Sequence, residues 1–183
     1  LRVKDSHPDS LLFYRMGDFY EMFLKDAEIA ASLLGITLTK RGSKDGLDVP
    51  MCGVPVHSVD GYLARLIRAG HKVAICEQIE DPQEQKQRGG KGPLKRDVVR
   101  ILTPGTLIED ELLPARAHNY LVALGHAESK TAVAWADMST GDFLVQEIAD
   151  DGLETLIARL DPAEMIYPHD YDLPNWVTDS QIC

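Results

Sequence analysis

The sequence predicts a mixed α/β fold in two parts, and three observations support this. Short strand-like runs alternate with helical ones in the first part of the chain. After residue 115, three strand-like runs separated by short polar turns are typical of an antiparallel meander. The charge also changes there: residues 1–115 hold 16 basic against 17 acidic side chains, and residues 116–183 hold 3 against 12. We expect one domain over 1–115 and a second, partial one over 116–183.

Composition excludes several classes of protein. With 183 residues, of which 44% are hydrophobic and 26% charged, the chain is neither disordered nor collagen-like. No apolar run approaches the roughly 18 residues of a membrane span, so no membrane partner is expected. Three cysteines without a CxxC pair argue against a disulfide framework or a Cys-rich zinc site, and they favour a reducing, cytoplasmic setting. The ends lack an initiator Met and a final cap, which predicts a fragment of a longer protein.

The first domain begins with an apolar and aromatic strand, Leu11–Met16, which Gly17 and Asp18 interrupt. Apolar residues then follow helical spacing from Tyr20 to Leu34. Asp18, three residues before Glu21, is a candidate N-cap for this helix, and Gly35 is suited to end it.

Further strands and one helix complete this domain. A strand is expected at Ile36–Thr39, and a proline-interrupted edge or connecting segment at Val49–Pro55. Ser58 can cap a helix that ends near Ala69. Beyond it we expect, in order, a strand at 72–76, a polar loop at 81–95 and a strand at 98–102.

The second domain shows the meander and then one helix and one strand. The runs of the meander are Tyr120–Leu124, Thr131–Asp137 and Asp142–Ile148. Helical spacing at Gly152–Leu160 and a strand-like run at Met165–Tyr167 come next. We expect an incomplete sheet, because the chain stops before a second covering layer.

Basic residues gather in two places within the first domain. Residues 86–100 carry six basic side chains and one acidic one, and Lys40, Arg41 and Lys44 form a smaller cluster. Both clusters could face a polyanion, although a solvated basic loop has the same composition. We expect the 86–100 loop to be mobile without a ligand, because it has few apolar residues to bury.

Common catalytic motifs are missing from the sequence. It has no P-loop, no G-x-G-x-x-G after a strand, no H-E-x-x-H and no G-x-S-x-G. The informative stretch is Phe13–Phe23, which combines aromatic residues with one carboxylate. Phe19, Tyr20 and Phe23 could all pack in a core. Alternatively, an exposed Phe19 could wedge between base pairs from the minor groove, with the Glu21 carboxylate meeting a base edge.

The segment Met16-Gly17-Asp18-Phe19-Tyr20-Glu21 resembles the Phe-x-Glu mismatch-recognition motif of the MutS family of DNA mismatch repair proteins. Four other segments resemble blocks of this family in the same order; they are residues 38–42, 50–57, 73–78 and 98–106. Together they cover residues 7 to about 115. Residues 116–183, which include Asp137-Met138-Ser139-Thr140-Gly141, are similar to the start of the family's connector domain. The residues of these segments are most similar to those of bacterial members of the family.

The resemblance implies a mixed-sheet mismatch-recognition domain with flanking helices, followed by a truncated ribonuclease-H-like connector. It implies that Phe19 stacks on a mispaired base, that Glu21 hydrogen-bonds that base, and that Met16 lines the minor groove. Charge and position suggest phosphate contacts for Lys40, Arg41, Lys95 and Arg96.

Partners also follow from the resemblance. These are double-stranded DNA with mismatches or small loops, MutL through the connector, and a second copy in a homodimer of the parent protein. ATP and Mg²⁺ are implied for the parent protein only, so the fragment itself is expected to be no enzyme and to hold no cofactor. A bacterial cytoplasmic, nucleoid-associated location is expected.

One enzymatic alternative stays open at this stage. Ribonuclease-H-like folds can carry carboxylates that bind two metal ions for phosphodiester hydrolysis. Asp137 and Asp142 flank a tight turn after a strand and could act in this way, although both are also ordinary turn residues. The acidic balance of residues 116–183 argues against DNA binding by this part.

Overall fold

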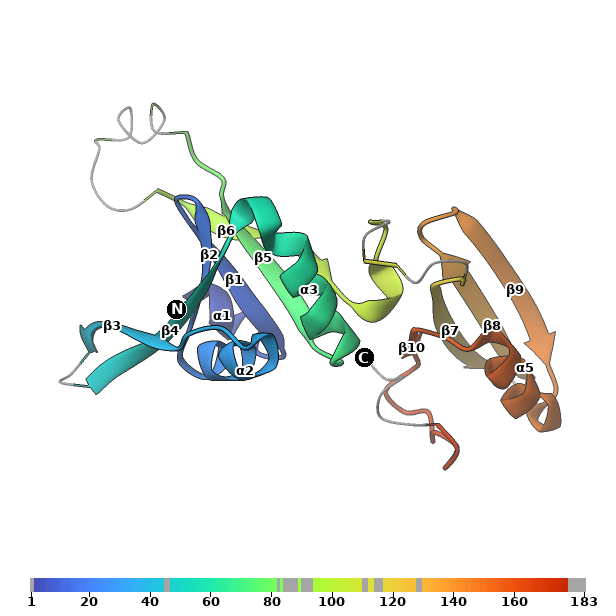
Figure 1. Ribbon diagram of the computed structural model, residues 1–183. Helices are drawn as coiled ribbons and strands as arrows, with labels where there is room; N and C mark the ends of the chain where they lie inside the picture. The colour runs from blue at the N-terminus through green and yellow to red at the C-terminus, as the bar shows by residue number, and fades with distance from the viewer. Residues whose placement is uncertain are drawn as a thin grey trace. The chain divides into compact units, whose positions relative to one another are not determined.

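The structure, a computed structural model, describes residues 2–44, 47–81, 83, 89, 94–109, 112–113, 117–127 and 130–177 (Figure 1). The chain divides into two compact units, Leu1–Leu102 and Thr103–Cys183. Each unit contains one sheet with both parallel and antiparallel strand pairs, together with helices. The predicted mixed α/β fold is confirmed. No helix in the described part of the chain is both long and apolar enough to cross a membrane.

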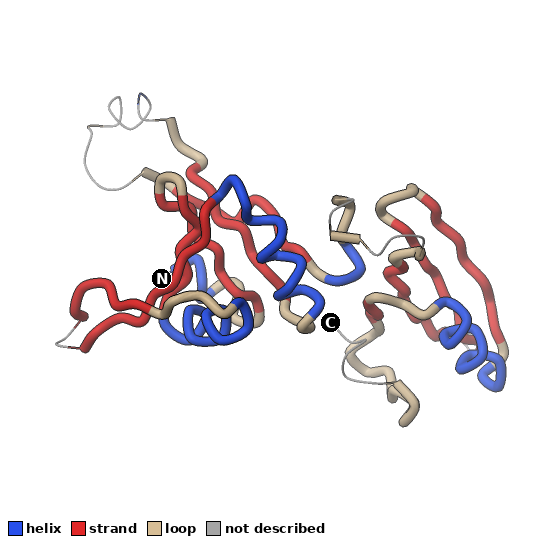
Figure 2. Tube along the Cα trace, in the orientation of Figure 1, coloured by secondary structure: helices blue, strands red, loops and turns tan. Residues whose placement is uncertain are grey.

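The first unit is built on a six-stranded sheet in the order β3-β4-β2-β1-β5-β6. Figure 2 shows the strands in red and the helices in blue. Its strands are β1 (Ser10–Met16), β2 (Phe19–Phe23), β3 (Thr39–Lys44), β4 (Leu47–Pro55), β5 (Lys72–Gln78) and β6 (Arg96–Leu102). Its helices are α1 (Arg2–Asp5), α2 (Leu24–Leu34) and α3 (Val59–Arg68), with a 3-10 turn η1 (Val56–Ser58). Strands β1 and β5 run parallel, and the other pairs are antiparallel.

Helices α2 and α3 pack on one face of this sheet. The Cys52 thiol on β4 donates a hydrogen bond to the Ala27 carbonyl of α2 at 3.4 Å, so Cys52 faces that helix. Met22 lies directly opposite Cys52 and is fully buried beside it. The other face has a smaller apolar cluster of Leu12, Ala74 and Cys76, against which Val3 of α1 packs. The wider core therefore lies under α2 and α3.

The structure corrects the prediction for residues 19–23. They form strand β2 and not the first turns of a helix, and Asp18 lies in the β1–β2 turn, so the predicted N-cap is wrong. The helix begins at Leu24, with Phe23 at the N-cap position and Gly35 ending it as predicted. Pairing with β1 and β4 decides the strand, because it buries alternate residues, Tyr20 and Met22.

Two further expectations differ from the structure. Strand β3 begins at Thr39 and contains the basic residues that were expected to follow it. Strand β4 is an interior strand between β3 and β2, not an edge. Its Pro50 is tolerated because the β2 register ends at the pair Phe23 and Met51, so β4 has a neighbour on one side only at Pro50.

The second unit has a four-stranded sheet in the order β10-β7-β8-β9. Its elements are β7 (Tyr120–Ala127), β8 (Lys130–Asp137), β9 (Asp142–Ile148), β10 (Glu164–Ile166), α5 (Leu153–Leu160) and the turns η2 (Pro104–Thr106) and η3 (Asp150–Gly152). The predicted antiparallel meander is confirmed as β7-β8-β9. Helix α5 packs against the face that contains Val133 and Trp135. Phe143 and Val145 of β9 are 69% and 62% exposed.

The first compact unit ends at Leu102 and the second begins at Thr103, and the domain boundary expected at residue 115 stays a prediction. Turn η2 belongs to the second unit because the Thr103 hydroxyl and the Gly105 N–H both donate hydrogen bonds to the buried Glu164 carboxylate of β10. A Cβ atom at Gly105 would lie 2.7 Å from the Glu164 Cβ, so this close approach requires glycine.

Candidate nucleic-acid interface

The β1–β2 hairpin sets the position of the predicted recognition residues. Met16 pairs with Phe19 across a two-residue turn, Gly17-Asp18, and Gly17 has a φ of 60°. This turn is typical of hairpins because a positive φ at its first residue matches the twist of the strands. Phe19 therefore begins β2 at the tip of the hairpin.

Register puts the recognition residues on one face. Residues directly opposite each other in a sheet share a face, as do alternate residues along a strand. The pairs Met16–Phe19 and Tyr14–Glu21 are therefore neighbours on one face. This is the face away from α2, because Met22 of the same strand alternates with Glu21 and is buried beside Cys52. Phe19 is 47% exposed there.

Tyr20, between Phe19 and Glu21, anchors the strand from the other side. Its hydroxyl is hydrogen-bonded to the Glu77 carboxylate of β5, and the Arg15 guanidinium lies 5.5 Å from the Tyr20 ring centre. Burial, together with the bond to Glu77, raises the pKa of Tyr20. Because Tyr20 points into the unit, its neighbours Phe19 and Glu21 must point outward.

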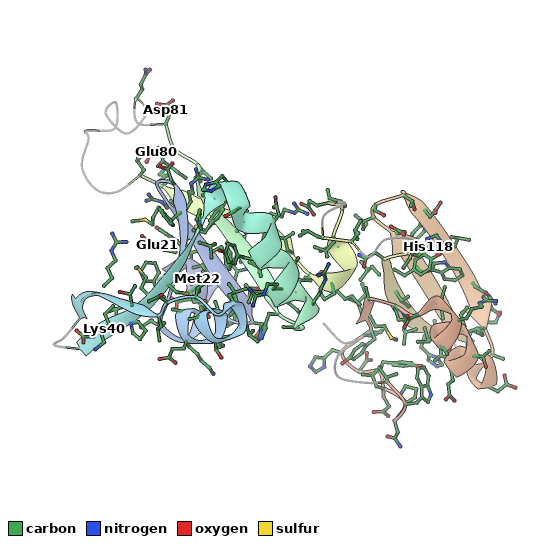
Figure 3. All side chains as sticks on the ribbon, in the orientation of Figure 1. Glu21, Met22, Lys40, Glu80, Asp81 and His118 are labelled. Carbon is green, nitrogen blue, oxygen red and sulfur yellow. The ribbon has the colours of Figure 1, made fainter. Side chains whose placement is uncertain are left out.

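The Glu21 carboxylate is paired with the Arg41 guanidinium of β3, and the two side chains are 17% and 49% exposed. Figure 3 draws the side chains and labels Glu21 and Lys40 of this unit. Directly opposite Glu21 on β4 is Gly53. A Cβ at Gly53 would lie 3.7 Å from the Glu21 Cγ and 4.0 Å from the Phe19 Cδ1. Gly53 thus leaves space beside both recognition residues.

The other basic residues have different surroundings. The Arg96 guanidinium lies 5.2 Å from the ring centre of Tyr14, which is Glu21's neighbour across the hairpin. The Lys40 ammonium contacts Asp48 at 2.7 Å, and that contact raises the pKa of Lys40. Lys95 is exposed, and its backbone N–H donates to the Glu80 carboxylate at 2.8 Å. Arg96 contacts Tyr14 and Arg41 contacts Glu21, so both arginines lie beside the face that carries Met16, Phe19 and Glu21; we call it the recognition face. The contacts of Lys40 and Lys95 are instead with Asp48 and Glu80.

Tyr14 and Gly53 were missed by the sequence analysis as members of this surface. Tyr14 could have been found, because it is two residues before Met16 on the same strand. Gly53 has no local signal, since its place opposite Glu21 depends on the β2–β4 register. The expected mobile loop at 86–100 falls largely on residues outside those the structure describes.

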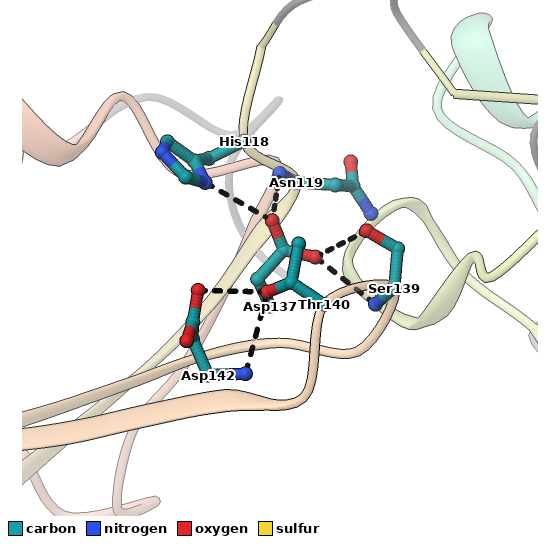
Figure 4. Close-up of polar contacts among 6 residues, drawn as sticks. All are labelled: His118, Asn119, Asp137, Ser139, Thr140 and Asp142. Carbon is teal, nitrogen blue, oxygen red and sulfur yellow. Dashed lines mark hydrogen bonds and ion pairs between the residues drawn. The ribbon is translucent and has the colours of Figure 1, made fainter.

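The two carboxylates of the nuclease alternative lie around the β8–β9 turn (Figure 4). Asp137 is buried, and both its oxygens are occupied. One accepts from the Ser139 hydroxyl at 2.6 Å and the Ser139 N–H at 3.0 Å. The other accepts from the Asn119 N–H at 3.1 Å and lies 3.3 Å from the His118 Nδ1.

This arrangement is that of a capped turn. Asp142 exchanges hydrogen bonds with Thr140 on the exposed side of the turn, away from the oxygens of Asp137. Within the described residues, no group of three or more His, Cys, Asp or Glu side chains is placed to hold a metal ion. The geometry gives the nuclease interpretation no support.

Comparison with known proteins agrees with the two-part organisation. The family model described as MutS domain I matches residues 1–111, and the model described as MutS domain II matches residues 119–181. The chain belongs to the MutS family. The expected resemblance is thereby confirmed. The first match includes the β1–β2 hairpin, and the second includes the β7-β8-β9 meander.

Individual MutS relatives match most of the chain. The DNA mismatch repair protein MutS of Ruegeria pomeroyi is 57% identical over 166 residues, which cover 91% of this chain and 19% of that protein. The protein of the same name from Nitrobacter hamburgensis is 56% identical over 171 residues, with the same two shares. That of Dinoroseobacter shibae is 52% identical over 181 residues, or 99% of this chain and 21% of that protein. The chain spans about a fifth of the length of these relatives.

Proposed function

We propose that this chain takes part in DNA mismatch repair by binding double-stranded DNA at mispaired bases. The observation that carries the proposal is the half-exposed Phe19 at the hairpin tip, with Met16 and Glu21 on the same face of the sheet. An apolar ring in this position can enter the minor groove and unstack one base step. The MutS relatives, named as mismatch repair proteins, support this choice of ligand.

Selectivity would come from the deformability of the DNA. Wedging a ring into a duplex and kinking it costs a few kcal/mol, and the cost is lower where pairing and stacking are already weak. Phe19 would convert this difference into a preference for many kinds of mismatch, without reading the sequence. Glu21 would accept or share a hydrogen bond with the displaced base, and Met16 would contact the groove.

Affinity would come from phosphate contacts. Arg41 and Arg96 adjoin the recognition face, and Lys40 and Lys95 are exposed cations of the same unit. Such contacts strengthen binding to any duplex and make it depend on salt concentration. We assign these four residues to affinity and Phe19 with Glu21 to discrimination.

The wider roles of the family are proposals for a longer protein that would contain this chain. They are a homodimer, ATP hydrolysis with Mg²⁺ in a separate domain, a MutL contact through the second unit, and a location at the bacterial nucleoid. For this chain alone we propose a binding module without catalytic activity.

A binding titration tests the proposed function. Two duplexes that differ only in one mismatched pair are titrated with the wild-type chain, the Phe19→Ala variant and the Leu38→Ala variant. Leu38 is a matched control, because it is 46% exposed. We expect Phe19→Ala to lose the preference for the mismatch and Leu38→Ala to keep it. A wild-type chain that binds both duplexes equally, or a selective Phe19→Ala variant, would contradict the proposal.

A further inference from the structure

The Glu21–Arg41 ion pair spans three strands. Strand β4 separates β3 from β2, so the Arg41 side chain crosses β4 to reach the Glu21 carboxylate. The acid is the more covered partner, at 17% exposure, and the guanidinium is 49% exposed. Arg41 is thus paired with Glu21 while about half of its side chain stays exposed.

A carboxylate on a DNA-binding face poses an electrostatic problem. Phosphates on both sides of a groove repel it, and a duplex that covers it also removes its water. A charge that becomes buried without a partner is costly, whereas a charge that stays in a hydrogen-bonded pair is much less so. Glu21 can therefore approach a base edge only if its charge is compensated.

We propose that Arg41 is a positioning residue for Glu21, and that the pair stays together when duplex DNA covers this face. This inference rests on the proposed function. Arg41 would compensate the carboxylate and hold it toward the base. It would not act merely as one more phosphate contact.

The chemistry of arginine supports a bridging role. A guanidinium has five N–H donors in a rigid fork, so one nitrogen can stay on a carboxylate while others reach a phosphate. Nη1 of Arg41 is on Glu21. Lys40, the preceding residue, has the same charge but is paired with Asp48. Lys40 and Arg41, which are adjacent and equally charged, therefore pair with different carboxylates.

A double-mutant cycle in DNA binding tests the proposal. The variants are Arg41→Gln, Glu21→Gln and the double variant, in this chain and in full-length Ruegeria pomeroyi MutS whose counterpart segment is replaced by this chain. Binding to the matched and the mismatched duplex is measured at one salt concentration. Arg41→Gln should weaken binding by about tenfold more in the Glu21 background than in the Glu21→Gln background, because it leaves a covered carboxylate unpaired.

Two variants serve as controls. Lys40→Gln should weaken binding equally in both backgrounds, because Lys40 does not contact Glu21. Arg41→Lys should recover most of the affinity lost in Arg41→Gln, since a cation is restored even though the fork geometry is not.

The sign of the coupling decides the outcome. Equal losses from Arg41→Gln in the two backgrounds would show an independent phosphate contact, and a smaller loss in the Glu21 background would show that DNA breaks the pair. Either result would overturn the inference. A coupling of the expected sign without mismatch preference in the wild-type protein would support the inference and contradict the proposed function. Absence of duplex binding in both proteins would overturn both.

Discussion

Phe13 and Phe19 lie on the two strands of one hairpin and have opposite surroundings. Phe13 is fully buried, and Phe19 is 47% exposed. Phe19→Ala should change the free energy of unfolding by less than about 1 kcal/mol, because an exposed ring leaves no cavity. Phe13→Ala, the matched control, should cost about 3–5 kcal/mol. Denaturant unfolding of both variants measures the difference, and a loss for Phe19→Ala as large as that for Phe13→Ala would place Phe19 in the core.

Asp137 makes the stability of the second unit depend on pH. Its burial alone would raise its pKa, but hydrogen bonds from Ser139, the Asn119 N–H and His118 outweigh burial and lower the pKa from 3.8 to about 2. The folded state therefore binds this proton less readily than the unfolded state. The stabilisation, about 2 kcal/mol, should be complete above pH 3.8 and be lost as the pH falls toward 2.

Comparison with Asp137→Asn isolates the contribution of the Asp137 carboxylate to the free energy of unfolding. The free energy of unfolding is measured by tryptophan fluorescence from about pH 5 to about pH 2 for the wild type and Asp137→Asn. The difference between them should shrink as the pH falls, because only the wild type has the carboxylate. Asp142→Asn, a change on the exposed side of the same turn, is the control. A difference between wild type and Asp137→Asn that stays constant over this range would refute the assignment.

At the scale of elements, the β1–β2 turn sets the position of Phe19, the proposed wedge residue. Gly17 has a φ of 60°, where a side chain is strained, and Gly61 in α3 has open space around it without a positive φ. Gly17→Ala should therefore cost about 1 kcal/mol, and Gly61→Ala should stabilise by about 0.5–1 kcal/mol.

Thermal unfolding of these two variants checks the opposite signs. If the turn also fixes the approach of Phe19, Gly17→Ala should reduce mismatch preference while Gly61→Ala leaves it unchanged. Destabilisation by both substitutions would mean that the turn conformation is not the cause.

At the scale of the whole molecule, the two units should unfold in separate steps. The second should unfold first, because Phe143 and Val145 of its sheet stay exposed and contribute little burial. Both tryptophans, Trp135 and Trp176, belong to the second unit, so their fluorescence reports on it alone.

Thiol labelling reports on the first unit. Cys52 and Cys76 are fully buried there, and burial raises the pKa of each to about 11. In a Cys183→Ser variant, we expect labelling to begin at a higher denaturant concentration than the change in fluorescence. Coincident transitions would show that the chain unfolds as one cooperative body.

Local pattern was sufficient for much of this fold. Helix α3 and strands β7 and β8 follow their apolar periodicity, because each buries one stripe or one face. Strand β5 is instead an unbroken apolar run, which is typical of a strand buried on both faces. The glycine that ends α2 could likewise be predicted, since Gly35 has the positive φ that glycine accepts at lowest cost.

For β2 and β4, by contrast, the local pattern was misleading. Residues 19–23 also fit a helix, and only pairing with β1 and β4 makes them a strand. Pro50 suggested an edge position for β4, but the pairing of β4 with β2 ends at Met51, the residue after Pro50, so the proline interrupts no hydrogen bond to β2. In both cases the pairing of β2 with β4 contributes to the outcome, and these two strands are far apart in sequence, so no local rule includes it.

What the sequence by itself determined was the family, the mixed α/β class and the identity of Phe19 and Glu21 as candidate recognition residues, because these depend on residue types in a short, ordered motif. Only the tertiary structure decided that Phe19 is exposed, that Arg41 pairs with Glu21 across β4, and that Asp137 caps a turn. The physical reason is that exposure and ion pairing depend on strand order and register, which bring together residues separated by tens of positions along the chain.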